Sequence, residues 1–204
     1  MKRYTANINT SHPIIAIDIG YSAKTASCAL TYSGSRETQT IQFGECIEAT
    51  RHLIEKKGKH TIILEAVLST YHRPDGNPDI RGDFEKGRGW YYGPGVSTFA
   101  AAIRFLQVLD QKLPEDIRPI PIVEGFLSYK KIRTQHADDA QRLLKEFYTA
   151  EHFKARSGSE PIISEIEGIP SIVRYNHPQQ FEPTLQVNYL RHQIRFRGTL
   201  RNRH

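Results

Sequence analysis

Near the start of the chain stands the stretch Ile14-Ile15-Ala16-Ile17-Asp18-Ile19-Gly20, in which Asp18 is the one charged residue. A strand that is buried on both faces shows such a continuous apolar run, whereas a strand with one face in water alternates apolar and polar residues. The stretch therefore predicts a central strand of a sheet. Because an unpaired buried carboxylate is costly, Asp18 needs a partner there.

The segments that follow predict the rest of the sheet and its helices. β-Rich runs at 25–32 and 38–43 come soon after the first strand, which indicates an antiparallel meander of three strands. The remaining expected elements are a helix at 45–57, a strand at 61–67, a helix at 97–113, a strand at 118–126 and a helix at 135–152. Since helical crossovers connect parallel strands, this order predicts an α/β fold. We expect one mixed five-stranded sheet, with three antiparallel and two further parallel strands, flanked by helices.

The chain of 204 residues fits one domain with an appendage. We expect residues 1–153 to form that domain, with a glycine-rich insertion at 69–95. Insertions of this length are usually functional or disordered. Residues 154–204 are expected to form a basic C-terminal appendage, in which five arginines and no acidic residue follow Thr184.

The amino-acid composition argues against several classes of protein. Hydrophobic residues make up 38% and charged residues 25%, which is typical of a globular chain. Cys28 and Cys46 lack CxxC spacing, which argues against a disulfide framework and a cysteine zinc site. No apolar run approaches about 18 residues, and no apolar signal-peptide core begins the chain. We therefore expect a cytoplasmic protein without a membrane partner, and its net charge of +6 favours an anionic partner.

Three further residues could share a site with Asp18. Glu65 interrupts the second apolar strand, close to its C-terminal end. A turn of about 100° per residue places His136 near the centre of the last helix's apolar face and Asp139 at its margin, with Asp138 almost opposite. Carboxylates that approach one another need a cation, and hard divalent metals take oxygen ligands. The alternative for each acid is a structural pairing with loop amides or an arginine.

The pattern of these residues resembles the RuvC-type RNase H-like nucleases, which include Holliday-junction resolvases. The likeness rests on Asp18, Glu65 and the run His136-Ala137-Asp138-Asp139-Ala140. Bacterial predicted RNase H-like nucleases are similar in three further runs, which are residues 64–66, 89–95 and 124–130. The likeness covers about residues 14–150 and implies an RNase H-like fold for them.

This resemblance implies a metal-dependent nuclease, a hydrolase that cleaves phosphodiester bonds of nucleic acid, with DNA favoured over RNA. Two Mg²⁺ or Mn²⁺ ions would serve as cofactors. Asp18 would bridge both ions, while Glu65 and Asp139 would each complete the coordination of one. His136 would bind the second ion or assist the attacking water. Glu124, at the end of the fifth strand, would support the site from behind or cap the following turn, and a homodimer is compatible with the family.

Cationic and aromatic residues flank the expected site in two segments, and such residues suit backbone charge and base stacking. One segment is the insertion, which begins soon after Glu65, and the other leads into His136. The expected nucleic-acid contacts are Arg73, Arg81, Arg88, Trp90, Lys130, Lys131 and Arg133. Two alternatives stay open: the insertion's aromatic residues pack on the domain, or the arginine-rich end of the chain supplies the contacts.

Two other functions also stay open. A catalytically idle RNase H-like module would bind nucleic acid without cleaving it, although the four candidate residues argue against that. Asp18-Ile19-Gly20 followed by Thr25 resembles the first phosphate loop of actin-like ATPases and sugar kinases. Those proteins need two such domains and a second phosphate loop, which this sequence lacks.

Overall fold

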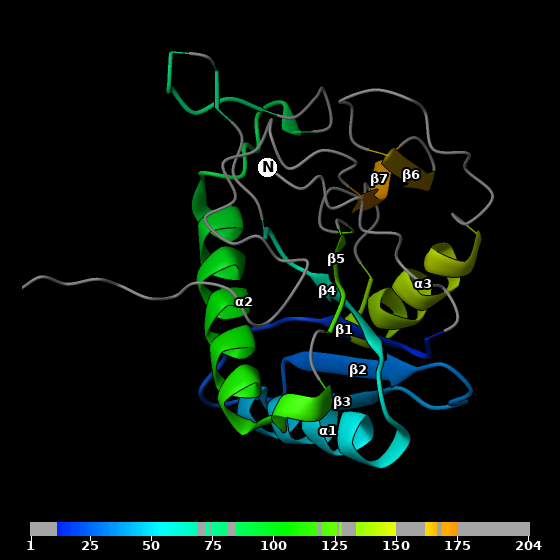
Figure 1. Ribbon diagram of the computed structural model, residues 1–204. Helices are drawn as coiled ribbons and strands as arrows, with labels where there is room; N and C mark the ends of the chain where they lie inside the picture. Colours follow the sequence, from blue (N-terminus) through cyan, green and yellow to red (C-terminus); the bar gives the residue numbers. More distant parts are fainter. Residues whose placement is uncertain are drawn as a thin grey trace, which may run out of the picture.

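The computed structural model describes residues 12–68, 72–73, 75–80, 85–117, 120–125, 127, 134–149, 162–166 and 169–174. A mixed sheet with helices on both faces forms its centre (Figure 1). The first five strands are β1 (Ile14–Asp18), β2 (Cys28–Tyr32), β3 (Gln39–Ile41), β4 (Thr61–Glu65) and β5 (Ile122–Gly125). The α-helices are α1 (Phe43–Lys57), α2 (Gly93–Lys112) and α3 (His136–Thr149), and a 3₁₀ turn, η2 (Glu115–Ile117), follows α2.

The predicted α/β fold with a mixed five-stranded sheet is confirmed. β2 pairs antiparallel with both β1 and β3, which makes the meander. β4 then runs parallel to β1, and β5 runs parallel to β4. The observed order is β3-β2-β1-β4-β5, so the apolar strand β1 lies at the centre of these five strands.

Two more strands extend this sheet beyond β5. They are β6 (Ile162–Ile166) and β7 (Ile169–Arg174), which form an antiparallel hairpin within the expected C-terminal appendage. β7 pairs antiparallel with β5, so the order continues as β5-β7-β6. The arginine-rich segment after Thr184 lies outside the described residues.

The sheet separates two apolar cores, and this explains why β1 is apolar on both faces. Ile15 and Ile17 pack with α1 and α2, where Phe105 is fully buried. Ile14 and Ala16 face the other way and pack against α3. Figure 1 shows α3 across the sheet from α1 and α2. No helix among the described residues is long and apolar enough to cross a membrane.

The start of α2 corrects one boundary. The sequence predicts a helix from residue 97 and assigns residues 93–95 to the irregular insertion, but α2 already begins at Gly93. Pro94 fits the first turn, because the amide it lacks would have no helical partner there. Gly95 is required by a close approach, since a Cβ at this position would lie 2.3 Å from the Trp90 carbonyl oxygen.

Candidate metal centre

Two of the candidate carboxylates leave the sheet side by side. β1 and β4 are parallel, and Asp18 stands directly opposite Glu65 in their register. Side chains at paired positions of neighbouring strands point to the same face of a sheet. Asp18 follows the alternation of Ile14 and Ala16, so both carboxylates lie on the face that α3 covers. The two apolar strands therefore place two acids together at their C-terminal ends.

The third carboxylate comes from the first turn of α3. One oxygen from each of Asp18, Glu65 and Asp139 lies within 4.8 Å of the others, and we call these three residues the carboxylate cluster. Their exposed fractions are 6%, 5% and 5%, respectively. Three buried acids from two strands and a helix thus converge at one point, where β1 and β4 end and α3 begins (Figure 1).

His136 lies beside the cluster and contacts it directly. Its Nδ1–H donates a hydrogen bond of 2.7 Å to Oδ2 of Asp18, and half of its side chain is exposed. This hydrogen bond raises the pKa of His136, and the charges of Asp18, Glu65 and Asp139 raise it further, while partial burial opposes them. The carboxylates therefore favour the protonated form of His136, which lies on the solvent side of the cluster.

The two adjacent aspartates of α3 face in different directions, as the helical phase predicts. Asp138 is exposed, and one of its oxygens accepts a long hydrogen bond of 3.4 Å from the Gln135 amide. Asp139 is buried, and the Thr134 hydroxyl donates to its Oδ1. The backbone amide of Asp139 donates to the Gln135 carbonyl, which closes the first turn of the helix. Local helix geometry thus directs Asp139, and not Asp138, into the site.

Thr134 is a site residue that the sequence analysis missed. Its hydroxyl donates a hydrogen bond to one oxygen of Asp139. Because the carboxylate is rigid and planar, this bond also fixes the direction of the other oxygen. Residues that hydrogen-bond a metal ligand in this way orient it and tune its affinity for the ion. A threonine two residues before a helix is a common feature, so the signal in the sequence was present but not specific.

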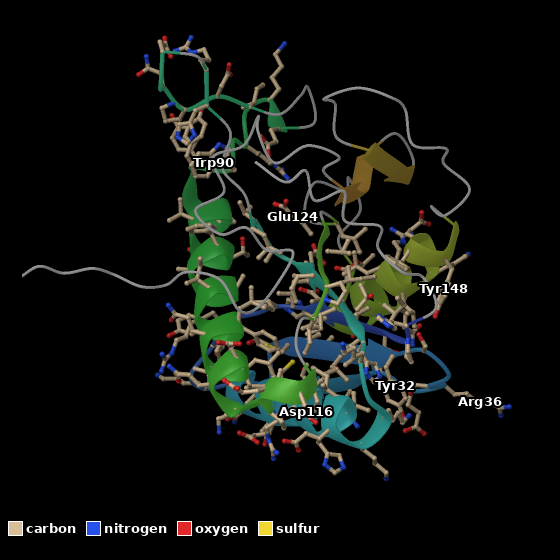
Figure 2. The ribbon with its side chains drawn as sticks, in the orientation of Figure 1. Tyr32, Arg36, Trp90, Asp116, Glu124 and Tyr148 are labelled. Carbon is tan, nitrogen blue, oxygen red and sulfur yellow. The ribbon has the colours of Figure 1, made fainter. Side chains whose placement is uncertain are left out.

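Glu124 does not belong to the cluster. It stands opposite Leu64 in the register of β4 and β5, and Leu64 packs in the core with α1 and α2. The Glu124 carboxylate therefore points to the other face of the sheet from Glu65. There its Oε1 accepts a 2.9 Å hydrogen bond from the buried Leu68 amide. Glu124, labelled in Figure 2, thus holds the chain that leaves β4.

Gly125 is the second residue that the sequence analysis missed. It pairs with Glu65 in the register, so a side chain there would point toward α3. A Cβ at Gly125 would approach Leu143 Cδ2 to 2.6 Å and the Leu64 carbonyl oxygen to 3.4 Å. The missing side chain thus allows α3 to pack closely on β5, next to the cluster.

Three of the seven predicted nucleic-acid contacts lie within the described residues. Trp90 is half-buried; its indole N–H donates to the Asp79 carbonyl at 3.1 Å, and its ring packs edge-to-face on His72. Arg73 is half-exposed and lies 3.7 Å from Asp75, while Arg88 is exposed. Trp90 therefore packs against other residues of the insertion. The other predicted contacts lie outside the described residues; they are Arg81, Lys130, Lys131 and Arg133.

The donor set of the cluster fits a hard divalent cation. Its ligands are carboxylate oxygens, which Mg²⁺ and Mn²⁺ prefer, and thiolate ligands are absent from it. Cys28 and Cys46 are both buried with free thiols, and Cys28 donates to the Gly20 carbonyl instead. Asp18, Glu65 and Asp139 are therefore the residues that could hold a metal, with His136 at its edge.

Comparison with known proteins adds no relative to this picture: no family model, curated protein or solved structure matches the chain.

Proposed function

We propose that this protein is a divalent-metal-dependent nuclease that hydrolyses phosphodiester bonds of nucleic acid, with DNA favoured as the substrate. One observation carries the proposal: three buried carboxylates from β1, β4 and α3 have oxygens within 4.8 Å of one another. The mixed sheet, with its antiparallel meander and two further parallel strands, is compatible with the RNase H-like fold that the resemblance to RuvC-type nucleases implies. The charge of +6 suits an anionic polymer.

Repulsion between the three carboxylates favours the binding of a cation at the cluster. Two like charges about 4 Å apart repel by about 4 kcal/mol at an effective dielectric constant of 20. Three carboxylates make three such pairs, and a protonated His136 would offset part of that repulsion. A divalent ion carries twice this charge and would lie closer to the oxygens. The cluster therefore favours metal binding over a purely structural role.

The residues of the candidate site have different proposed roles. Asp18 is central, since it stands between Glu65 and His136 and contacts the latter through Oδ2. Thr134 holds Asp139 in place through its hydroxyl. Bound Mg²⁺ or Mn²⁺ ions would activate the attacking water and neutralise charge on the phosphate. The ring of His136 is half-exposed beside Asp18, so it could donate a proton or a hydrogen bond to a phosphate that reaches the cluster from solvent.

A cleavage screen tests the proposal. Purified protein with Mg²⁺ or Mn²⁺ is incubated with single-stranded DNA, duplex DNA, a four-way junction, RNA and an RNA–DNA hybrid. We expect cleavage of at least one DNA substrate by the wild type and none by Asp18→Asn. Absence of cleavage on all five substrates, in protein that binds the metal, would support the non-catalytic module instead.

The screen needs a matched control for each loss of activity. Asp138→Asn makes the same change from aspartate to asparagine as Asp18→Asn, but the Asp138 side chain is exposed on α3 and lies outside the cluster. We expect this variant to cleave like the wild type. EDTA should abolish the activity of both proteins, and added Mn²⁺ should restore it.

A further inference from the structure

A pocket of about 420 Å³ lies on the opposite flank of α3 from the cluster. One wall is the turn between β2 and β3, and the other is the flank of α3 that carries Gln141, Lys145 and Tyr148. These three helical residues are spaced by four and three positions, so they form one stripe along the helix. Figure 2 shows Arg36 reaching out from the turn and Tyr148 on the helix above it. The pocket is therefore a groove between a hairpin and a helix.

Hydrogen bonds hold the two walls together. The Ser33 hydroxyl and the Tyr148 hydroxyl lie 2.6 Å apart and share a hydrogen bond. Gln141 Nε2 donates to Thr38 Oγ1 at 2.8 Å. The Ser33 amide donates to the Ile14 carbonyl, which fixes the turn to β1. The groove is thus formed by contacts within the fold and keeps its shape without a ligand.

The chemistry of the groove suits an anion. Its lining includes the cations Arg36 and Lys145, and its hydroxyl groups include those of Ser33 and Ser35. No carboxylate side chain is among the described residues that line it. The Ser35 hydroxyl also donates a hydrogen bond of 2.8 Å to the backbone carbonyl of Glu37, which fixes the turn.

We propose that this groove binds backbone phosphates of the nucleic-acid strand that is cut at the carboxylate cluster. The inference rests on the proposed function and names a second contact of the same substrate. Lys145 follows Asp139 by six residues, which is about 9 Å along the axis at 1.5 Å per residue. One strand advances about 3.4 Å along a duplex axis per nucleotide. The groove also lies across α3 from the cluster, which adds about one helix diameter of 10–12 Å, so it contacts phosphates several nucleotides from the cut.

A passing strand fits the groove better than an enclosed small molecule. The groove is open to solvent, and Arg36 is exposed beside the turn. The groove opens along the flank of α3 that carries Gln141, Lys145 and Tyr148. A strand can follow this flank between the groove and the cluster. Free phosphate or a nucleotide shares the same chemistry, and the experiment separates the two sources.

The experiment measures binding of labelled single-stranded DNA, with Ca²⁺ replacing Mg²⁺ so that the strand stays intact. The test variant is Arg36→Ala/Lys145→Ala. The matched control is Arg104→Ala/Lys56→Ala, which also removes one exposed arginine and one exposed lysine, but from the helices on the other face of the sheet. Fluorescence anisotropy at several salt concentrations gives the affinity and its salt slope. Circular dichroism confirms that both variants are folded.

We expect the test variant to bind the DNA several-fold more weakly and its affinity to depend less steeply on salt concentration. Each phosphate contact of a single strand contributes about 0.7 to the slope of log K against log salt. Loss of two contacts should therefore lower the slope by about 1.4, while the control shifts it less. Gln141→Glu keeps the shape of the groove and adds a negative charge, so it should weaken binding mainly at low salt. A strand shortened by several nucleotides on the groove side of the cut should bind wild type and variant alike.

The outcomes separate this inference from the proposed function. If the wild type cleaves DNA but the test variant matches the control in affinity and slope, the groove inference is overturned and the nuclease stands. Free phosphate or a nucleoside monophosphate is added as a competitor of the labelled oligonucleotide. If it displaces the oligonucleotide fully at a concentration below that of the oligonucleotide's own phosphates, the groove is a small-molecule site and not a contact of the strand. If the wild type neither binds nor cleaves any nucleic acid, the proposed function itself is contradicted.

Discussion

Glu65 and Glu124 are both buried glutamates near the ends of neighbouring parallel strands, yet they lie on opposite faces of the sheet. Glu124 lies on the face that packs with α1 and α2, where it accepts a hydrogen bond from the Leu68 amide. Glu65 lies on the α3 face, within 4.8 Å of two other carboxylates. A buried acid in a strand therefore indicates a candidate metal site when other acids converge on it. It indicates a structural role when it accepts a hydrogen bond from a backbone amide.

The largest effect is expected from the third member of the cluster. Asp139→Asn should reduce cleavage by a hundredfold or more, because metal stabilisation of the transition state contributes several kcal/mol. Asp138→Asn should retain most of the activity, since its side chain is exposed on the same helix turn. Initial cleavage rates at saturating Mg²⁺ measure both. Equal losses in the two variants would show that the phase of α3 is wrong.

A smaller effect is expected from the residue that orients Asp139. Thr134→Val keeps the shape of the side chain and removes the hydroxyl that donates to Asp139. Residues in this position typically change metal affinity by about 10- to 100-fold. We expect the affinity for Mn²⁺ to fall by about tenfold in calorimetry, and Thr134→Ser to restore it. Failure of serine to restore binding would mean that the threonine acts through packing instead.

The two glutamates should respond oppositely to the loss of their charge. In metal-free protein, Glu65→Gln relieves repulsion within the cluster and should raise the free energy of unfolding. Glu124→Gln weakens a charge-assisted hydrogen bond to Leu68 and should lower that free energy by about 1 kcal/mol. Urea unfolding in the presence of EDTA measures both changes. Changes of the same sign would remove the distinction between the two faces of the sheet.

The smallest effect concerns His60, which lies before β4, at the other end of the strand from Glu65. Its Nδ1–H donates to the Gly58 carbonyl, and burial lowers its pKa, whereas the carboxylates raise that of His136. Below about pH 6.5 the unfolded chain protonates His60 more readily than the folded protein does, so stability falls as the pH drops. His60→Gln should flatten this part of the stability profile. Urea unfolding between about pH 5 and 7.5 measures it, and an unchanged profile would exclude His60 as its cause.

Much of the site could be predicted because it rests on strong local patterns. Asp18 and Glu65 interrupt apolar runs, and such runs are typical of strands buried on both faces. Their convergence then follows from parallel pairing. Asp139 could be separated from Asp138 because a helix with a clear apolar stripe has a known phase. Each of these predictions used a pattern of apolar residues that is visible in the sequence, either a continuous strand run or a helical stripe.

The features that were missed depend on register or on contacts between distant segments. The face of Glu124 could not be assigned, because a shift of one residue in a strand reverses every side chain. The start of α2 was misplaced, because glycine and proline at 93–95 favour a loop until the close approach of Gly95 to the Trp90 carbonyl is known. The groove joins residues about a hundred positions apart, which no local pattern reveals.

The most direct test of the central claim is calorimetric titration of Mn²⁺ into the metal-free wild type, Asp18→Asn and Asp138→Asn. We predict saturable binding by the wild type and Asp138→Asn, and loss of that binding in Asp18→Asn. Circular dichroism must show that all three proteins are folded. Binding by folded Asp18→Asn with wild-type affinity would contradict the claim that Asp18, Glu65 and Asp139 form a metal centre.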